Sequence, residues 1–394
     1  MNKNELINFE KKIVNLYFDN KLPFLFHLSG GNEMQLIKIF KKIKKDDFVI
    51  SSHRNHYHAL LHGISKSELR NKILNGRSMF IYNKKRNFLC SAIIGSTPSI
   101  AVGIAFALKK LKSKKKVWCF VGDGTEDNGH TFEAARYIDG WDLPCKIVIE
   151  CNDRSVEASN KDRWGKTSKL TWSFNSIIKY NYKINFPHAR TPGMIDLSKS
   201  KKLTDLDYFP LIKKNKYLKY NYRGTKISYK DAITQSMEML ARHNVHFIGY
   251  NVAKGDAMGS LKNIKNSLKI ETPVAENLMA GMALGMSLIN GFTLLYIERH
   301  DFILNAMDCI VNHIDKIERI SHGEFIPKVI IRAVTADGGP FYSGPTHSQD
   351  FTEALAKFVS MPIYDPKDGK EVIEAYKNIL RSNRSAIVIE RKSL

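Results

Sequence analysis

The sequence lacks a long apolar segment, and this absence excludes the simplest kind of membrane protein. The apolar stretch SAIIGSTPSIAVGIAFAL, residues 91–108, is interrupted by serine, threonine, proline and glycine, whereas a membrane-spanning helix needs about 18 or more consecutive apolar residues. The N-terminal stretch MNKNELINFEKKIVNLYF has no signal-peptide core and predicts an amphipathic helix. We therefore expect a cytoplasmic protein without a membrane partner.

Cysteine is sparse and has no metal-binding or disulfide pattern. The cysteines are odd in number and form no CxxC pair; they are Cys90, Cys119, Cys145, Cys151 and Cys309. Disulfide frameworks and zinc sites both need paired or closely spaced cysteines, so neither is expected here. We expect buried free thiols.

Acidic residues are too few to balance the basic ones, and the formal net charge is +22. Such a balance can indicate nucleic acid or an anionic surface as a partner. The lysines are spread through predicted helices such as LKKLKSKKK, and no recognisable nucleic-acid motif accompanies them. We interpret them as solvated helix faces with some attraction for phosphorylated ligands, and expect no nucleic-acid partner.

The chain does contain two successive alternations of strand and helix patterns. The first has the strand-like runs DDFVISSH, KVWCFVGD and CKIVIECN, and the second has HFIGYNVA, FTLLYIE, KVIIRAV and SAIVIERK. Short β-branched runs that end in polar turns are typical of buried parallel strands. The sequence therefore predicts an α/β protein with two domains, each a mostly parallel sheet with helices on both faces. We place the domains at residues 1–197 and 226–394, with a Lys-, Tyr- and Asn-rich linker at 198–225.

Two strands of the first half end in polar residues that can act together. Asp123 follows VWCFV and Asn152 follows KIVIE. If the strands are neighbours, both side chains lie at the carboxyl edge of the sheet, where open parallel sheets bind ligands. Gly122 and Gly124 permit a tight turn and a close ligand approach. Oxygens of a carboxylate, an amide and a turn carbonyl suit Mg²⁺, usually completed by ligand phosphates, although GDG alone is also a common turn.

The order of several motifs resembles the thiamine diphosphate-binding subunit of the 2-oxo acid dehydrogenases, of the pyruvate dehydrogenase type. The motifs are SSHRNHYHALLHG, RSMFIYNK, AIIGSTPSIAVGIAFALK and GDGTEDNGHTFEAA…LPCKIVIECN. This resemblance implies that Asp123, Asn152 and the carbonyl of Arg154 hold Mg²⁺. It also implies that Arg54 reaches the diphosphate and that the backbone around Ile94 supports the aminopyrimidine.

The second half resembles the partner subunit of the same enzymes, through ETPVAENLMAGMALGMSLINGFTLLYIERHDFILNAMDCIVNHIDKI, KVIIRAV and GPTHSQD. The resemblance implies that Glu276 hydrogen-bonds the aminopyrimidine ring and thereby activates the thiazolium carbon. It places Phe302 beside the pyrimidine and assigns substrate protons and charge to His347.

Each of these residues also has an ordinary interpretation. Glu276 alone could be an acid that interacts with a helix dipole, and Phe302 alone would more often be a core residue. The histidines could belong to polar clusters, and we assign His53 and His62 to that class. The ordered succession of motifs favours the family, so the catalytic candidates are Glu276, His347, His56 and His58.

The pattern departs from the family at several positions. Cys151 replaces an asparagine, Phe80 replaces a histidine, and His188 in NFPHARTPG is a weak candidate for the active-site histidine loop. The sequence ends at SAIVIERKSL, where the partner subunit normally continues into a further domain, which we expect to be absent. These departures affect the residues expected to bind the substrate and the acyl acceptor more than those expected to bind the cofactor.

The expected function is decarboxylation of a 2-oxo acid by thiamine diphosphate and Mg²⁺, with transfer of the acyl or hydroxyalkyl fragment. A lipoyl-bearing acyltransferase as acceptor would make the protein a dehydrogenase component. An alternative is a stand-alone carboligase, decarboxylase or ketol transferase. A non-catalytic basic binding protein is disfavoured because Asp123, Asn152 and Glu276 are all present. A chain with both domain types is expected to form a homodimer.

Overall fold

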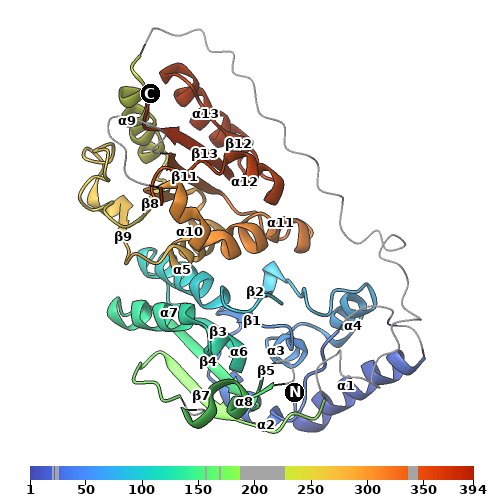
Figure 1. The fold of residues 1–394 in the computed structure, drawn as a ribbon. Helices are drawn as coiled ribbons and strands as arrows, with labels where there is room; N and C mark the ends of the chain where they lie inside the picture. Colours follow the sequence, from blue (N-terminus) through green and yellow to red (C-terminus); the bar gives the residue numbers. More distant parts are fainter. Residues whose placement is uncertain (20–21, 23–25, 156–157, 168–169, 187–226, 336–344) are drawn as a thin grey trace. The chain divides into compact units, whose positions relative to one another are not determined.

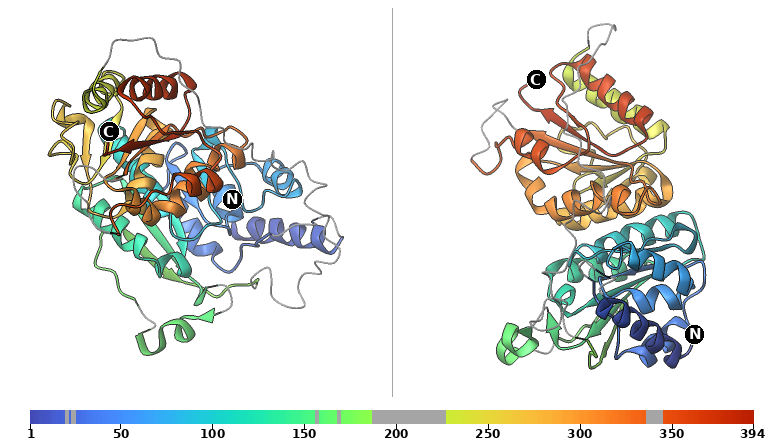
Figure 2. Two further views of the ribbon diagram at one scale, coloured as in Figure 1. Left: turned by 45° about the horizontal axis from the view of Figure 1, so that its top comes forward. Right: turned by 90° about the vertical axis from the view of Figure 1, so that its right-hand side faces the viewer.

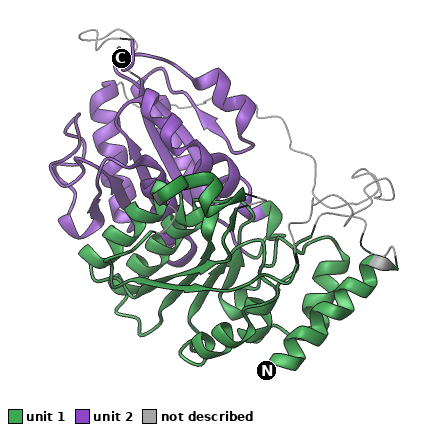
Figure 3. Ribbon diagram, turned by 60° about the horizontal axis from the view of Figure 1, so that its bottom comes forward, with its two compact units in different colours: residues 1–210, 319–324 green, residues 211–318, 325–394 purple. Residues whose placement is uncertain are grey.

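The computed structural model describes the whole chain except residues 20–21, 23–25, 156–157, 168–169, 187–226 and 336–344 (Figure 1). The chain divides into two compact units, residues 1–210 with 319–324 and residues 211–318 with 325–394 (Figure 3). The predicted linker and His188 lie outside the described residues. Among the helices of the described part, none combines the length and the apolar character that crossing a membrane requires.

The first unit is built on a five-stranded, entirely parallel sheet in the order β2-β1-β3-β4-β7. Its strands are β1 (Phe48–Ser51), β2 (Phe88–Cys90), β3 (Val117–Gly122), β4 (Cys145–Cys151) and β7 (Ile177–Asn181). The central strands are nearly continuous apolar runs because both faces of the sheet are covered. The predicted strands in DDFVISSH, KVWCFVGD and CKIVIECN are confirmed as β1, β3 and β4.

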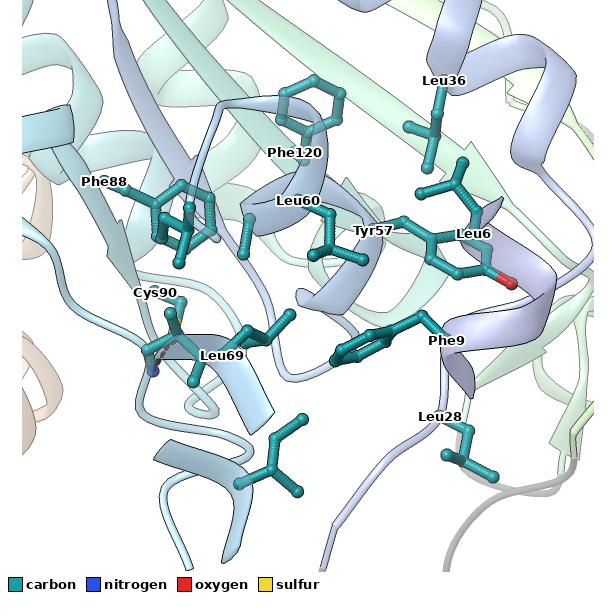
Figure 4. Packing of buried hydrophobic residues seen from close by; sticks show 14 of the residues in the cluster. Leu6, Phe9, Leu28, Leu36, Tyr57, Leu60, Leu69, Phe88, Cys90 and Phe120 are labelled. Atoms are coloured by element: carbon teal, nitrogen blue, oxygen red, sulfur yellow. Dashed lines mark hydrogen bonds between the residues drawn. The ribbon is translucent and has the colours of Figure 1, made fainter. Parts of the chain in front are cut away.

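Helices cover both faces of this sheet. One face packs against α1 (Lys3–Phe18), α2 (Glu33–Phe40), α3 (His56–Leu61) and α4 (Lys66–Leu74), as Figure 4 shows for residues such as Phe9 and Phe120. On the other face, α5 (Thr97–Lys110) contacts β1, β3 and β4, and α7 (Gly129–Gly140) packs on α5. Short elements complete the unit: η1 (Lys84–Arg86), α6 (Asp123–Glu126), the antiparallel pair β5 (Arg154–Ser155) and β6 (Ala158–Ser159), α8 (Asn160–Trp164) and η2 (Gly165–Thr167).

The second unit, the yellow-to-red part of the ribbon in Figure 2, has a parallel sheet. This sheet has six strands in the order β12-β13-β11-β10-β8-β9. Its strands are β8 (His246–Gly249), β9 (Lys269–Glu271), β10 (Thr293–Ile297), β11 (Val329–Thr335), β12 (Ile363–Tyr364) and β13 (Ala386–Arg391). Its core joins the sheet to α9 (Tyr229–Arg242) and α13 (Gly369–Ser382), while α10 (Glu276–Asn290) contacts β8, β10 and β11. The remaining elements are η5 (Asn266–Leu268), η6 (His300–Ala306), η7 (Asp308–Ile314), α11 (Ile317–Ile320) and α12 (Thr352–Phe358).

Side chains just outside the helices define where several of them begin. The side chain of Asn2 accepts a hydrogen bond from the backbone of Glu5, and the Glu5 side chain returns one to the Asn2 backbone, which forms a capping box for α1. The side chains of Asn128 and Ser228 likewise accept a hydrogen bond from the first-turn backbone of α7 and α9, without the return bond. Such caps satisfy backbone donors that have no partner within the helix.

One feature of the second core was not predicted from the sequence. Arg332, in the middle of KVIIRAV, is completely buried and pairs with Asp256 at 2.8 Å and with Glu390 at 2.7 Å. Its guanidinium also lies 5.0 Å from the ring centroid of Tyr296. A buried charge requires such partners, because its desolvation is otherwise costly.

Candidate active site

Asp123 and Asn152 meet at the carboxyl edge of the first sheet. β3 and β4 are parallel neighbours with Gly122 opposite Glu150, which confirms the predicted adjacency of the two strands. The backbone N–H of Asn152 donates to Asp123 Oδ1 at 2.9 Å, and the Cys151 thiol donates to Asp123 Oδ2 at 3.3 Å. Burial, with a contribution from Asp123, raises the pKa of the Cys151 thiol, so the thiol keeps the proton it donates.

A cavity of about 360 Å³ opens at these strand ends. Its lining includes every cofactor or metal residue that the sequence predicts in the first unit: Arg54, Ile94, Gly122, Asp123, Gly124, Asn152 and Arg154. It also includes residues that were not predicted: Ser52, His53, Ser91, Ile93, Thr97, Thr125, Glu150, Ser155, Tyr182, Ile184 and Asn185. The predicted residues therefore come together in one place, although they are drawn from segments far apart in the sequence.

The two glycines beside Asp123 have different surroundings. A Cβ atom on Gly124 would lie 2.6 Å from Ser155 Oγ and 3.3 Å from Ile94 Cδ1, so a side chain at this position would force Ser155 to shift. A Cβ on Gly122 would meet nothing within 4 Å, and its backbone angles, φ −98° and ψ −179°, are open to any residue. The turn at Gly122 therefore does not itself require a glycine, and the close ligand approach expected there stays a prediction.

The Asn152 side chain presents an oxygen that the described part of the protein does not satisfy. Its Nδ2 donates to the Tyr182 hydroxyl at 3.1 Å, whereas Oδ1 is buried and has no hydrogen-bond partner among the described residues. An amide oxygen beside a buried carboxylate matches the oxygen ligands that Mg²⁺ prefers. No group of three or more His, Cys, Asp or Glu side chains in the described ranges can hold a metal ion. A cation here would therefore depend on Asp123, Asn152, a backbone carbonyl and ligand oxygens.

Glu150 forms the polar floor of the same cavity. This carboxylate is 6% exposed and accepts hydrogen bonds from Asn32 Nδ2 at 3.0 Å, from His58 Nε2 at 3.2 Å and from the Tyr180 hydroxyl. Burial and the Glu150 charge raise the pKa of Tyr180, which keeps its proton available for this bond. Glu150 is therefore held by hydrogen bonds from three other segments of the first unit.

The structure corrects the catalytic assignment of two histidines. His56 is fully buried, with Nδ1 bonded to Glu10 at 2.9 Å and Nε2 to Ser78 at 2.9 Å. His58 is 1% exposed, with Nδ1 bonded to Ser51 at 2.6 Å and Nε2 to Glu150. Neither ring lines the cavity, so both act as buried hydrogen-bonding groups rather than as groups open to a substrate.

His53, which we assigned to the ordinary histidines, does line the cavity. Its ring packs edge-on against His27 with centroids 4.6 Å apart. Arg54, beside it in the sequence, donates from Nη1 to the Leu28 carbonyl at 2.7 Å, which directs the guanidinium along the cavity wall. His62 is buried and donates to backbone carbonyls, and burial lowers its pKa, in agreement with a structural role.

The second unit brings its own predicted residues together around η6, beyond the end of β10. Glu276 is the first residue of α10, is 5% exposed, and accepts a hydrogen bond from Asn305 Nδ2 at 3.3 Å. The rings of Phe302 and His347 meet nearly at right angles with centroids 5.2 Å apart. Gln349 donates to Asp301 at 2.9 Å and ties the segment after His347 to η6. Phe302 is half-buried rather than a fully packed core residue.

Comparisons with known proteins agree with this geometry. The model of the family described as "Dehydrogenase E1 component" matches residues 1–167. The pyruvate dehydrogenase E1 component subunit alpha of Porphyra purpurea is 26% identical over 295 residues, which cover 67% of this chain and 82% of that protein. The chloroplastic subunit alpha-3 of Arabidopsis thaliana is 34% identical over 161 residues, which cover 37% of this chain and 38% of that protein. The match to the corresponding subunit of Rickettsia prowazekii (strain Madrid E) covers half of that protein.

Solved structures show that the similarity in fold extends over both units. Transketolase from Leishmania mexicana matches with a TM-score of 0.71 and 14% identity, covering 98% of this chain and 77% of that one. Transketolase from Campylobacter jejuni matches with a TM-score of 0.66 and 13% identity, covering 100% of this chain and 79% of that one. The predicted fold class is confirmed. The chain is therefore similar to dehydrogenase E1 components over residues 1–167, and both units share the fold of the transketolases.

Proposed function

We propose that this enzyme binds thiamine diphosphate with Mg²⁺ and decarboxylates a small 2-oxo acid, passing the acyl or hydroxyalkyl fragment to an acceptor. The observation that carries the proposal is Asn152 Oδ1, a buried oxygen without a partner among the described residues, beside the Asp123 carboxylate in the cavity. A buried unpaired acceptor costs about 1–3 kcal/mol. A cation bound between Asn152 Oδ1 and the Asp123 carboxylate would remove this cost, because it would supply the missing partner of Oδ1.

In the first unit, the proposed roles concern binding. Asp123, Asn152 and the carbonyl of Arg154 hold the cation, and Arg54 neutralises a diphosphate oxygen. Gly124 allows the ligand to approach the backbone closely, because a Cβ atom here would already lie 2.6 Å from Ser155 Oγ. The positive net charge of the chain favours approach of the anionic cofactor.

In the second unit, the proposed roles concern activation. The bound cofactor supplies the electron sink that decarboxylation of a 2-oxo acid requires. Glu276, held by Asn305, donates a hydrogen bond to the ring nitrogen of the aminopyrimidine. Phe302 lies beside that ring, and His347, packed against Phe302, handles protons and charge of the substrate.

The acceptor distinguishes two versions of this function. A lipoyl-bearing acyltransferase would be the partner if the enzyme acts like the pyruvate dehydrogenase E1 relatives. A carboligase, decarboxylase or ketol transferase working alone is the second candidate. The acceptor can differ among the relatives: the alpha subunit of acetoin:2,6-dichlorophenolindophenol oxidoreductase of Bacillus subtilis is 28% identical over 158 residues, and its name specifies acetoin and a dye.

Assembly and location follow from the same proposal. One chain that carries both a diphosphate-binding and a pyrimidine-binding unit forms a homodimer with two symmetry-related sites. We place the enzyme in the cytoplasm, with a small 2-oxo acid as substrate and neither nucleic acid nor a membrane as partner.

The test begins with binding and then examines turnover. Calorimetric titration of the purified protein with thiamine diphosphate should show binding that depends on Mg²⁺. The loaded protein is then incubated with a panel of 2-oxo acids, with and without a lipoyl domain or an aldehyde, and CO₂ and the carbon product are measured. Absence of Mg²⁺-dependent cofactor binding would overturn the proposal; the product identifies the acceptor.

A further inference from the structure

Tyr182 occupies a position that the sequence did not single out, immediately beside the two oxygens of the cation site. It follows β7, the edge strand, and its backbone N–H donates to the Cys151 carbonyl at 2.9 Å. That bond extends the pairing of β4 with β7 by one residue. The backbone alone therefore fixes Tyr182 next to Asn152, at the wall of the cavity.

The side chains of the two residues are joined at one specific atom pair. Asn152 Nδ2 donates to the Tyr182 hydroxyl at 3.1 Å, while Asn152 Oδ1 is buried and has no partner among the described residues. An amide group has two faces of opposite polarity, and only its oxygen can ligate a cation. An acceptor placed at Nδ2 therefore selects the orientation in which Oδ1 is available.

The Tyr182 hydroxyl can accept this hydrogen bond, because a phenolic oxygen is an acceptor as well as a donor. Tyr180, two residues earlier, has its hydroxyl on Glu150 and Asn32 instead and does not bond Asn152.

We infer that Tyr182 is a positioning residue of the cation site, whose hydroxyl holds the Asn152 amide so that Oδ1 faces the cation held with Asp123. This inference rests on the proposed function, since it assigns a task within the same site. Groups that orient metal ligands in this way typically affect metal affinity by about tenfold to a hundredfold when they are removed.

The test compares Tyr182→Phe with Tyr57→Phe, since both remove one tyrosine hydroxyl from the first unit, and Tyr57, whose hydroxyl donates to Glu33 at 3.2 Å, does not line the cavity. The readout is the Mg²⁺ concentration that half-saturates binding of thiamine diphosphate, measured by calorimetry, together with the melting temperature of the cofactor-free protein. We expect Tyr182→Phe to raise that concentration roughly tenfold to a hundredfold, and Tyr57→Phe to leave it unchanged. An unchanged value in Tyr182→Phe, or equal increases in both variants, would overturn the inference.

A measurement on the parent protein keeps the inference testable if Tyr182→Phe fails to fold. With ¹⁵N-labelled asparagine, and with Asn152→Asp used only for assignment, the side-chain amide protons of Asn152 should exchange slowly with water in the Mg²⁺-loaded protein. Fast exchange would contradict the bond to Tyr182. If the parent protein shows no Mg²⁺-dependent cofactor binding at all, the proposed function fails instead, so the two failures are distinguishable.

Discussion

Asn152 and Asp123 are joined directly: the backbone N–H of Asn152 donates a 2.9 Å hydrogen bond to Oδ1 of Asp123. The bond links the ends of two neighbouring parallel strands, and so fixes the distance between two oxygen-bearing side chains. Because the same carboxylate also accepts from the Cys151 thiol, the aspartate is held from two sides before any ligand is present. Because the oxygen atoms are already held in place, ligand binding loses less conformational entropy in ordering these side chains.

Asp123→Asn should weaken Mg²⁺-dependent binding of thiamine diphosphate while the fold is kept. The substitution preserves the size of the side chain but removes its charge. A contact with a charged group is worth about 1.5–3 kcal/mol, which corresponds to roughly tenfold to a hundredfold in affinity. Calorimetry measures the change. Asp127→Asn is the matched control, because Asp127 pairs with Arg163 at 2.9 Å and does not line the cavity; equal effects in both variants would contradict the assignment.

Gly124→Ala should destabilise the protein by about 1–3 kcal/mol, the usual scale for an overpacked position. The added Cβ would lie 2.6 Å from Ser155 Oγ. Combining it with Ser155→Ala removes that oxygen and should restore much of the stability, as measured by urea denaturation. Gly122→Ala should leave the free energy of unfolding nearly unchanged, since its Cβ meets nothing within 4 Å, but should weaken cofactor binding. A stable Gly124→Ala variant would show that the close approach to Ser155 does not matter.

Glu276→Gln should retain cofactor binding, because the proposed diphosphate and cation contacts belong to the other unit. Hydrogen–deuterium exchange at the thiazolium carbon should slow by roughly 10²–10⁴-fold, the usual scale for loss of acid–base assistance. NMR of the bound cofactor follows this exchange without knowledge of the substrate. If Glu276 only interacts with the dipole of α10, exchange stays normal and stability changes by about 0.3–1 kcal/mol.

Mixing two impaired variants should raise activity above that of either one, at a cofactor concentration too low to fill Asp123→Asn, if the enzyme is a homodimer whose sites combine units from both chains. Asp123→Asn and Glu276→Gln each impair both sites of their own dimer. Random pairing of the co-expressed chains gives about half mixed dimers, each with one intact site of two, and so about a quarter of the parental turnover. Sedimentation or light scattering measures the mass of the parent. A monomer that turns over substrate, or mixed dimers without recovered activity, would contradict this arrangement.

Local patterns in the sequence determined most of the strands of the two sheets and most of the helices that cover them. Runs such as KVWCFVGD and CKIVIECN are buried on both faces, so they carry a continuous apolar signal that is visible without the fold. The edge strand β7 was not predicted, because its residues are partly exposed and include Lys179, Tyr180 and Asn181. Its identity as a strand depends on pairing with β4, which lies in a different part of the sequence.

The same distinction holds for the site. The spacing from Asp123 to Asn152 is encoded in one short segment, so the sequence by itself determined this pair. Only the tertiary structure decided that His56 and His58 are buried hydrogen-bonding groups, that His53 lines the cavity, and that Tyr182 contacts Asn152. Residue type says what a side chain can do chemically. Burial and hydrogen-bond partners depend on which distant segments pack together, and that packing is fixed by the fold as a whole.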